Sequence, residues 1–267
     1  MTLPDLAPPD LAPLVRVAAA AADAAGAVIR PFFRAGVAAD AKSDDSPVTI
    51  ADRNAEIAAR AVIREACPDH GVLGEEFGLD NASALLRWVL DPIDGTRAFI
   101  TGRPTFGTLI ALLADGVPVI GIIDQPVTGE RWIGVRGEAT RFSGPYGGRA
   151  GTRRCAGLAA AELSCTSVEM FEADDVAPWS RLNRAVRRTS YGGDCYAYGL
   201  LALGQIDIIA ESTMKLWDWA ALVPVIEGAG GVIGDWQGRP LTPDSDGHVL
   251  ALGDPALRAA ALACLGA

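Results

Sequence analysis

The feature that most limits the fold is a hydrophobic stretch, residues 87–113, that acidic residues interrupt in its middle. The run breaks at "DPIDGT", residues 91–96, and then resumes. The apolar residues before the break predict a strand over Trp88–Leu90. After it, residues 106–126 predict a β-hairpin, because two apolar runs flank Asp115-Gly116, a pair that tolerates positive φ. The chain should therefore build a sheet that carries acids where one strand ends.

Helices and strands alternate along the chain, without the regular unit of a βα-barrel. Helical spacing of apolar residues predicts helices over Leu14–Phe33 and Ala51–Glu65, and "GVLGEEFG" predicts a strand that ends in a turn. Later segments predict further strands near residues 130–137, 162–168, 206–210 and 249–254, and helices near 179–186, 196–203, 218–231 and the C-terminus. We expect a layered α+β sandwich, divided into a loose tail at 1–13, an N-terminal α+β half at 14–148 with the metal site, and a C-terminal α/β half at 149–267 that completes the substrate site.

The composition excludes several classes of function. A formal net charge of -10 and a pI near 4.7 repel phosphate backbones, so we expect no nucleic-acid partner. The sequence shows no signal-peptide pattern and no unbroken run of roughly 18 apolar residues, so we expect no membrane partner and a cytoplasmic location. The five cysteines are widely spaced without a C-x-x-C pair, which predicts reduced thiols. With only two histidines, catalysis must depend on carboxylates.

The two acids of the "DPIDGT" segment are placed to bind a cation. At a strand end the side chains project beyond the sheet, and Pro92 should stop the hydrogen-bond ladder there. Asp91 and Asp94 can then face one point, with the carbonyl of Ile93 free between them. These oxygens would form one side of a binding site.

The end of the same segment is suited to an anion. Gly95 allows the backbone to approach a ligand closely. Thr96 is suited to cap a helix whose free N–H groups face the same point. The segment therefore offers oxygen ligands beside a cradle for an anion.

Clustered carboxylates require a counter-ion. Two carboxylates about 4 Å apart repel by roughly 4 kcal/mol at an effective dielectric near 20, and Glu75 and Asp218 would add to that repulsion. With oxygen ligands alone, Mg²⁺ is the natural choice and Mn²⁺ the second. A Mg²⁺ cluster beside a phosphate cradle indicates phosphoryl chemistry.

Each motif also has a structural interpretation. The "DPIDGT" segment could be a turn, the glutamates of "GEE" a solvated face, and Asp218 a helix N-cap. Two other phosphatase patterns are absent, since the chain has neither D-x-D-G-T nor G-x-x-x-x-G-K-[ST]. The motifs argue for a site only in combination.

Together the segments "GEE" (74–76), "WVLDPIDGT" (88–96) and "LWDWAALVPVIEGAGG" (216–231) resemble the inositol monophosphatase superfamily in order and separation. The resemblance covers about residues 14–262. It implies a five-layered αβαβα sandwich and Mg²⁺-dependent hydrolysis of a phosphate monoester. It also makes a homodimer the expected assembly.

The resemblance implies roles for individual residues. One metal, which activates water, would be held by Glu75, Asp91 and the carbonyl of Ile93. A second, which stabilises the leaving alkoxide, would be held by Asp91, Asp94 and Asp218.

Further residues complete the implied site. Thr96 and Asp52 would orient the attacking water, and the amides of Gly95 and Thr96 would hold the phosphate. The chain departs from lithium-sensitive members at Ser46, where they have an acid, which leaves a third metal near Lys42 and Asp52 open.

The substrate side resembles the histidinol-phosphate phosphatase branch, especially in "YGGDCYAYGLLALGQIDIIAE" (191–211). Asp194 and Glu211 would contact the leaving group, where two carboxylates suit an ammonium and an imidazole better than hydroxyls. Structurally, Asp194 could instead cap the helix near Tyr196, and Glu211 could be a solvated strand end. The alternatives for function are an inositol-1-phosphate or sugar-phosphate phosphatase and, more remotely, a non-catalytic partner of the transcription machinery.

Overall fold

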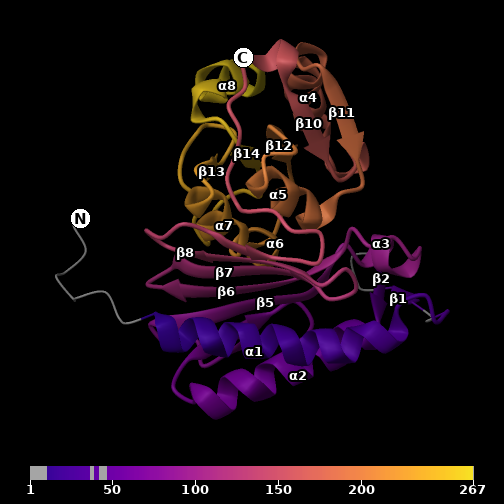
Figure 1. Ribbon diagram of the computed structural model, residues 1–267, viewed down its shortest axis with the longest axis vertical. Coiled ribbons are helices and arrows are strands. Elements are labelled where there is room, and N and C mark those ends of the chain that lie inside the picture. Colours follow the sequence, from indigo (N-terminus) through magenta and orange to yellow (C-terminus); the bar gives the residue numbers. More distant parts are fainter. Residues whose placement is uncertain (1–10, 37–38, 42–46, 267) are drawn as a thin grey trace.

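The computed structural model describes residues 11–36, 39–41 and 47–266. These residues form five stacked layers, in which helices and sheets alternate (Figure 1). The expected α+β class and the five-layered αβαβα sandwich are confirmed.

The first layer consists of two packed helices, α1 (Ala12–Ile29), continued by the 3₁₀ turn η1 (Arg30–Phe32), and α2 (Ile50–Ala66). Residues 12 and 13, expected in the tail, belong to α1. By length and composition α1 could cross a membrane, but its buried face, which includes Val15 and Ile29, packs in the core between the helices and the first sheet. It therefore has the position of a core helix.

The second layer is a seven-stranded sheet of order β4-β3-β5-β6-β7-β8-β9, antiparallel except for the parallel pair β3–β5. Its strands are β3 (Gly71–Gly74), β4 (Gly78–Asp80), β5 (Leu86–Asp94), β6 (Gly107–Ala114), β7 (Val117–Gln125), β8 (Glu130–Val135) and β9 (Arg141–Ser143). The expected hairpin is confirmed as β6 and β7, with positive φ at both Asp115 and Gly116. The short helix α3 (Thr96–Ile100) follows β5, and a separate antiparallel pair joins β1 (Ala39–Ala41) to β2 (Pro47–Thr49).

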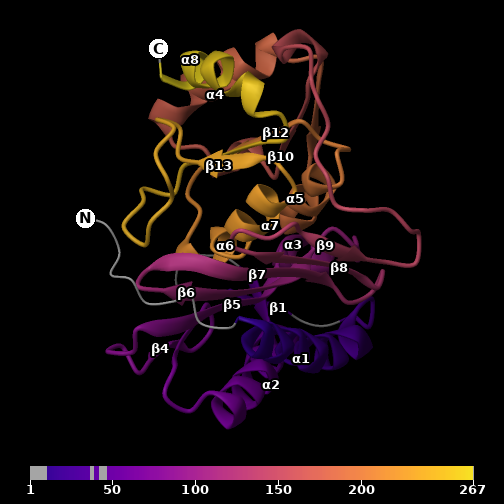
Figure 2. The same ribbon diagram turned by 60° about the vertical axis from the view of Figure 1, so that its left-hand side comes forward.

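The outer three layers come from the second part of the chain. Helices α5 (Asp194–Ala202), α6 (Leu216–Trp219) and α7 (Leu222–Gly228) lie between the two sheets (Figures 1 and 2). The second sheet has the order β11-β10-β12-β14-β13, built from β10 (Glu162–Cys165), β11 (Arg188–Tyr191), β12 (Ile208–Glu211), β13 (Val232–Gly234) and β14 (Val249–Leu252). Outside it lie α4 (Ala173–Ala185) and α8 (Arg258–Gly266), with the 3₁₀ turns η2 (Leu158–Ala160), η3 (Val168–Met170) and η4 (Pro255–Leu257) in the connections.

Two predicted helices differ from the structure. The helix expected over 218–231 is two helices, because Pro224 has no N–H to donate to the carbonyl of Ala220, where the break occurs. The helix expected near 179 begins at Ala173, since the amide of Glu172 donates to the carboxylate of Asp175 and so caps an earlier start. The division of the chain at residues 148 and 149 stays a prediction.

Candidate active site

Three acids from two distant segments of the chain converge at the end of β5. Asp91, Asp94 and Asp218 each offer a carboxylate oxygen, and these oxygens lie within 4.8 Å of one another. The helices of the middle layer hold two of the acids, because Asp94 accepts a hydrogen bond of 2.6 Å from the amide of Cys195 at the start of α5, and Asp218 accepts one of 2.7 Å from the amide of Lys215. The cluster thus lies between the first sheet and the helices that cover it.

A β-bulge aims the first two acids. Pro92 does not stop the strand as expected: β5 continues to Asp94, and its register with β6 shifts between Asp91 and Asp94. The bulge places proline, which has no N–H, where the ladder is already interrupted. The hydroxyl of Thr108 donates to the Pro92 carbonyl at 2.7 Å, and the amide of Ile93 donates to Asp91 Oδ1 at 3.1 Å. The bulge is therefore fixed by hydrogen bonds on both sides.

The electrostatics of this cluster call for a cation. Burial raises the pKa of Asp91 well above its usual range, and the nearby carboxylates of Glu75, Asp94 and Asp218 raise it further. Burial likewise raises the pKa of Asp94, which the charges of Asp194 and Asp218 also raise, and it raises the pKa of Asp218 to about 7. Buried anions that repel one another are stabilised by a bound cation.

The donor set fits a hard divalent ion. The three clustered aspartates supply only oxygen atoms, and Glu75 adds a further carboxylate near Asp91. Oxygen ligands with this charge suit Mg²⁺ or Mn²⁺ rather than zinc, which prefers nitrogen and sulfur. The residues predicted as metal ligands therefore lie where such an ion could bind.

The turn that carries Glu75 depends on a residue that the sequence analysis did not identify. Glu56 on α2 is fully buried and accepts hydrogen bonds from the amides of Glu76, at 2.8 Å, and Phe77, at 3.3 Å. Arg60 one turn later donates to the same carboxylate at 2.7 Å. A side chain at Gly74 would meet Glu56 Oε1 at 1.9 Å, so glycine is required there. The (i, i+4) Glu–Arg spacing within the predicted helix was the available signal.

Thr96 and Asp52 meet as predicted, but Thr96 does not cap a helix. Gly95, in the left-handed region at φ 86°, is the N-cap of α3, and Thr96 is the first helical residue. The Thr96 hydroxyl lies 3.1 Å from the Ile93 carbonyl and 3.3 Å from Asp52 Oδ1. The other oxygen of Asp52 accepts from the amide and hydroxyl of Thr49 in a capping box at the start of α2. The Thr96 hydroxyl is thus directed into the site.

Burial raises the pKa of Asp52, against the hydrogen bonds from Thr49, which lower it. The amides of Gly95 and Thr96 lie at the start of α3, where first-turn N–H groups have no partner within the helix. The amides of the expected anion cradle thus lie next to the acid cluster in the chain, and anion binding by them stays a prediction. The stretch with Lys42 and Ser46, on which a third metal would depend, lies outside the described residues.

Asp194 approaches the site from the other side of the cleft. Its backbone is in the left-handed region, at φ 44°, and its side chain lies so close to Gly95 that a Cβ there would be 2.7 Å from Asp194 Cγ. Asp194 does not cap α5. The N-cap residue is Gly193, and the amide of Cys195 donates to Asp94 rather than to Asp194. Burial raises the pKa of Asp194 to about 6, with the charge of Glu211 acting in the same direction and the charges of Arg103 and Arg97 acting against it. Among the described residues, no hydrogen bond from another residue reaches its carboxylate.

Glu211 is not a solvated strand end. It is the last residue of β12, is 3% exposed, and accepts hydrogen bonds from the amide of Thr166 at 2.7 Å and the hydroxyl of Tyr198 at 2.8 Å. Burial raises its pKa. Thr166 and Tyr198 were not identified from the sequence, because their contacts with Glu211 join separate elements.

A cavity of about 150 Å³ connects these groups. Its lining includes four acids, Asp94, Asp194, Glu211 and Asp218, and two methionines, Met170 and Met214. A larger cavity of about 500 Å³ lies beside β10 and β11 and is lined by four arginines, of which Arg153 pairs with Asp207, Arg154 with Asp254 and Arg188 with Glu162. The smaller cavity is therefore the one that combines the predicted metal acids with a space for a ligand.

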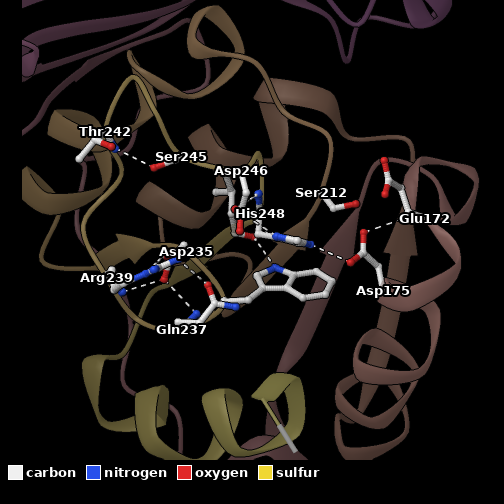
Figure 3. A network of polar contacts seen from close by, with 12 residues as sticks. Glu172, Asp175, Ser212, Asp235, Gln237, Arg239, Thr242, Ser245, Asp246 and His248 are labelled. Atoms are coloured by element: carbon white, nitrogen blue, oxygen red, sulfur yellow. Dashed lines mark hydrogen bonds and ion pairs between the residues drawn. The ribbon is translucent and has the colours of Figure 1, made fainter.

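A polar network supports the wall beside Glu211 (Figure 3). Ser212 donates to the carbonyl of Met170 at 3.1 Å, and its hydroxyl also lies beside the carboxylate of Asp175. That carboxylate lies 2.7 Å from His248 Nε2. The His248 ring packs against that of Trp236 at an angle of 41°, with 4.6 Å between the ring centroids. The segment from Thr166 to α4 is thus tied to the second sheet.

An all-oxygen acid cluster between two layers of an α+β sandwich, beside the amides of a helix start, is the arrangement expected of a divalent-metal phosphatase. A family model described as "Inositol monophosphatase family" matches residues 10–265. The bifunctional phosphatase IMPL2 of Arabidopsis thaliana is 48% identical over 88% of this chain and 68% of its own, and a histidinol-phosphatase of Chlorobaculum parvum is 35% identical over 90% and 93%. A solved inositol monophosphatase from Zymomonas mobilis is 48% identical, with a TM-score of 0.88 over 97% of this chain and 99% of its own.

The chain belongs to the inositol monophosphatase family. It is a phosphoric monoester hydrolase, and members of the family generally depend on Mg²⁺. The resemblance stated from the sequence is confirmed, including the similarity to histidinol-phosphatases. All five cysteines, each among the described residues, are free thiols, as expected.

Proposed function

We propose that the protein hydrolyses histidinol phosphate, with two Mg²⁺ ions per subunit that Mn²⁺ can replace. The observation that carries the choice of substrate is Asp194, a carboxylate on the cavity wall to which no other described residue donates a hydrogen bond. A substrate ammonium would provide the missing partner in a charge-assisted hydrogen bond. The histidinol-phosphatases among the relatives support the same choice.

The metal roles follow the placement of the acids. Glu75, Asp91 and the Ile93 carbonyl would hold one ion, and Asp91, Asp94 and Asp218 the other. Such ions, when bound, acidify a water molecule and stabilise charge on phosphoryl and leaving oxygens.

The chain's own groups have complementary roles. The Thr96 hydroxyl, hydrogen-bonded toward Asp52, orients the attacking water, and Asp52 holds that hydroxyl in place. The amides of Gly95 and Thr96 bind phosphoryl oxygens, on which charge builds up during in-line displacement. Asp194 and Glu211 bind the leaving group, so that the ester oxygen points toward the acid cluster.

Hydrolysis of inositol-1-phosphate is the second candidate. It is favoured by the 48% identity to the inositol monophosphatase from Zymomonas mobilis and by the bifunctional phosphatase among the relatives. An inositol leaving group carries only hydroxyls, so it would add no positive charge beside Asp194 to those of Arg103 and Arg97. The homodimer, the cytoplasmic location and a third metal stay predictions.

A phosphate-release assay with Mg²⁺ tests the proposal. The panel contains histidinol phosphate, inositol-1-phosphate, fructose-1,6-bisphosphate and adenosine 3′,5′-bisphosphate, with the Asp91→Asn variant purified in parallel to exclude a contaminating phosphatase. We expect kcat/KM for histidinol phosphate to exceed that of every other ester by about tenfold or more, as one charge-assisted contact allows. A preference for inositol-1-phosphate would overturn the proposal and support the second candidate.

A further inference from the structure

Both internal methionines of the chain line the same cavity. The sequence has three methionines, and the two beyond Met1, Met170 and Met214, lie on the wall of the cavity that contains Asp194 and Glu211. Met170 ends the turn η3, and Met214 lies between β12 and α6. The two reach this cavity from separate segments, and nothing in the proposed chemistry uses a thioether.

The two side chains have defined surroundings. The hydroxyl of Tyr198, which donates to Glu211, lies 3.5 Å from Met214 Sδ. Met170 Sδ lies 3.8 Å from the thiol of Cys165. The wall beside the leaving group is therefore a built surface rather than a pair of loose side chains.

The backbone of Met170 is also fixed. Its carbonyl accepts hydrogen bonds from Ser212 at 3.1 Å and Thr213 at 3.3 Å, and Ser212 belongs to the network with Asp175 and His248 in Figure 3. This network holds the turn η3 against the end of β12. The backbone of Met170 is thus held by hydrogen bonds from the two residues that follow Glu211.

A thioether wall distinguishes between kinds of ring. A thioether has no donor and is a weak acceptor, but its polarizable sulfur makes favourable contacts with aromatic rings. The hydroxyls of a polyol ring would lose hydrogen bonds to water against such a wall without gaining equivalent ones. The wall therefore favours a flat, unsaturated ring over a hydroxylated one.

We propose that Met170 and Met214 form the ring-binding wall of the leaving-group pocket and select esters whose alcohol carries a planar aromatic ring. The assignment of that ring to imidazole rests on the proposed function. Asp194 and Glu211 recognise the positive charge of the leaving group, and the two methionines recognise its ring.

The test separates ring from charge with three esters. Histidinol phosphate has both, O-phosphoethanolamine has an ammonium without a ring, and 2-phenylethyl phosphate has an aromatic ring without a charge. We expect Met170→Gln and Met214→Gln each to lower kcat/KM for the two ring esters by about three- to tenfold and to leave O-phosphoethanolamine within about twofold. The matching Leu variants, which keep an apolar wall, should lose less than the Gln variants.

Val168→Gln is the matched control, because Val168 lies on the same turn, is half exposed and does not line the cavity. It should behave as wild type on all three esters. Equal losses on the ring esters and on O-phosphoethanolamine, or no loss on the ring esters, would overturn the proposal.

A fourth ester keeps this inference separate from the choice of substrate. The wild-type protein should hydrolyse 2-phenylethyl phosphate faster than 2-cyclohexylethyl phosphate, and both Gln variants should lose that preference. If the preference is found while inositol-1-phosphate is better than histidinol phosphate, the proposed function fails and the ring-binding wall stands. If the wild type shows no preference between the two rings, the wall is refuted even where histidinol phosphate is the best substrate.

Discussion

Two groups of aspartates in this molecule have pKa values shifted in opposite directions. In the acid cluster, Asp91, Asp94 and Asp218 lie within reach of one another, and burial and mutual repulsion raise their pKa values. In the network of Figure 3, the carboxylates of Asp175 and Asp246 lie beside His248, and their hydrogen bonds to it lower their pKa values. The second group is balanced within the chain, whereas the first is not.

This difference indicates that the acid cluster serves function and that the network around His248 serves stability. A carboxylate that is hydrogen-bonded to a cationic group of the same chain contributes to the free energy of unfolding. Carboxylates that repel one another reduce it, and the fold keeps them together through the bulge in β5 and the starts of α5 and α6. The unbalanced group is therefore the one prepared for an external cation. Substitutions in the two groups should act on different measurements.

The largest effect is expected from Asp91→Asn. Asp91 lies at the centre of the acid cluster and is assigned to both metal ions, so its loss should lower kcat by at least about 10²-fold at saturating Mg²⁺. Phosphate release from the best substrate of the panel measures it. Near wild-type turnover would show that the two-metal assignment is wrong.

The same variant tests whether the cluster costs stability. Adding Mg²⁺ to the wild-type protein should raise its Tm, because an ion that binds the folded state alone stabilises it by about 2.7 kcal/mol at a hundredfold excess over its Kd. In EDTA, Asp91→Asn should be at least as stable as wild type, since one repelling charge is removed. If it is less stable without metal and still gains stability from Mg²⁺ as the wild type does, the contrast between the two groups fails.

The next effect concerns Asp194, which lies beside the acid cluster without belonging to its three converging carboxylates and accepts no hydrogen bond from the described residues. Asp194→Asn should lower kcat/KM for histidinol phosphate by about ten- to a hundredfold, the value of one charge-assisted contact. Parallel kinetics with a neutral test ester such as 2-phenylethyl phosphate are the control, and this ester should be spared. Equal losses on both esters would remove its role in specificity.

The acid cluster could be predicted because its information is local. Asp91 and Asp94 are three residues apart beside a proline and a glycine, and the strand before them is continuous and apolar. Helix propensity and apolar spacing likewise gave α1 and α2 to within a few residues. The resemblance to a family then added Glu75 and Asp218, which spacing alone does not connect.

The support of the site could not be predicted, because it depends on contacts between distant segments. The bond from Cys195 to Asp94, the burial of Glu211 by Thr166 and Tyr198, and the β-bulge itself all require the packed structure. Thr96 shows the limit clearly. A threonine before a helix is typical of an N-cap, but Gly95 holds that position. Glycine accepts the positive φ required there and has no side chain that would collide with Asp194.

Thr96→Ala should affect turnover more than stability. Since Thr96 makes no cap bond, its removal should change Tm little, while the loss of the hydroxyl beside Asp52 and Ile93 should lower kcat by about tenfold with a smaller change in KM. Steady-state kinetics and thermal unfolding of the same preparation measure both quantities. Thr96→Ser is the control, because it keeps the hydroxyl. A lowered Tm with unchanged kcat would return Thr96 to a purely structural role.

The smallest effect belongs to the balanced group and concerns His248. The hydrogen bond to Asp175 and the carboxylate of Asp246, whose Oδ1 lies 3.1 Å from Nδ1, raise its pKa above the ordinary value against burial, which lowers it. The charge of Arg239 acts on the same cluster through Asp246. Because the pKa of His248 is raised in the folded state, its contribution to the free energy of unfolding is complete below about pH 6.5. That contribution is lost as the pH rises through the folded pKa. Urea unfolding should therefore show His248→Gln to be less stable than wild type by about 1 kcal/mol at pH 5.5, and by less at pH 8.

The other histidine provides the control for this last measurement. Burial lowers the pKa of His70, which accepts a hydrogen bond from the indole of Trp88 at 3.1 Å, so its contribution is present at high pH and is lost as the pH falls. His70→Gln should therefore change the pH dependence of unfolding in the opposite sense to His248→Gln. A loss of stability in His248→Gln that is the same at pH 5.5 and pH 8 would mean that packing on Trp236, and not charge, holds the network together, and the contrast with the acid cluster would then rest on that cluster alone.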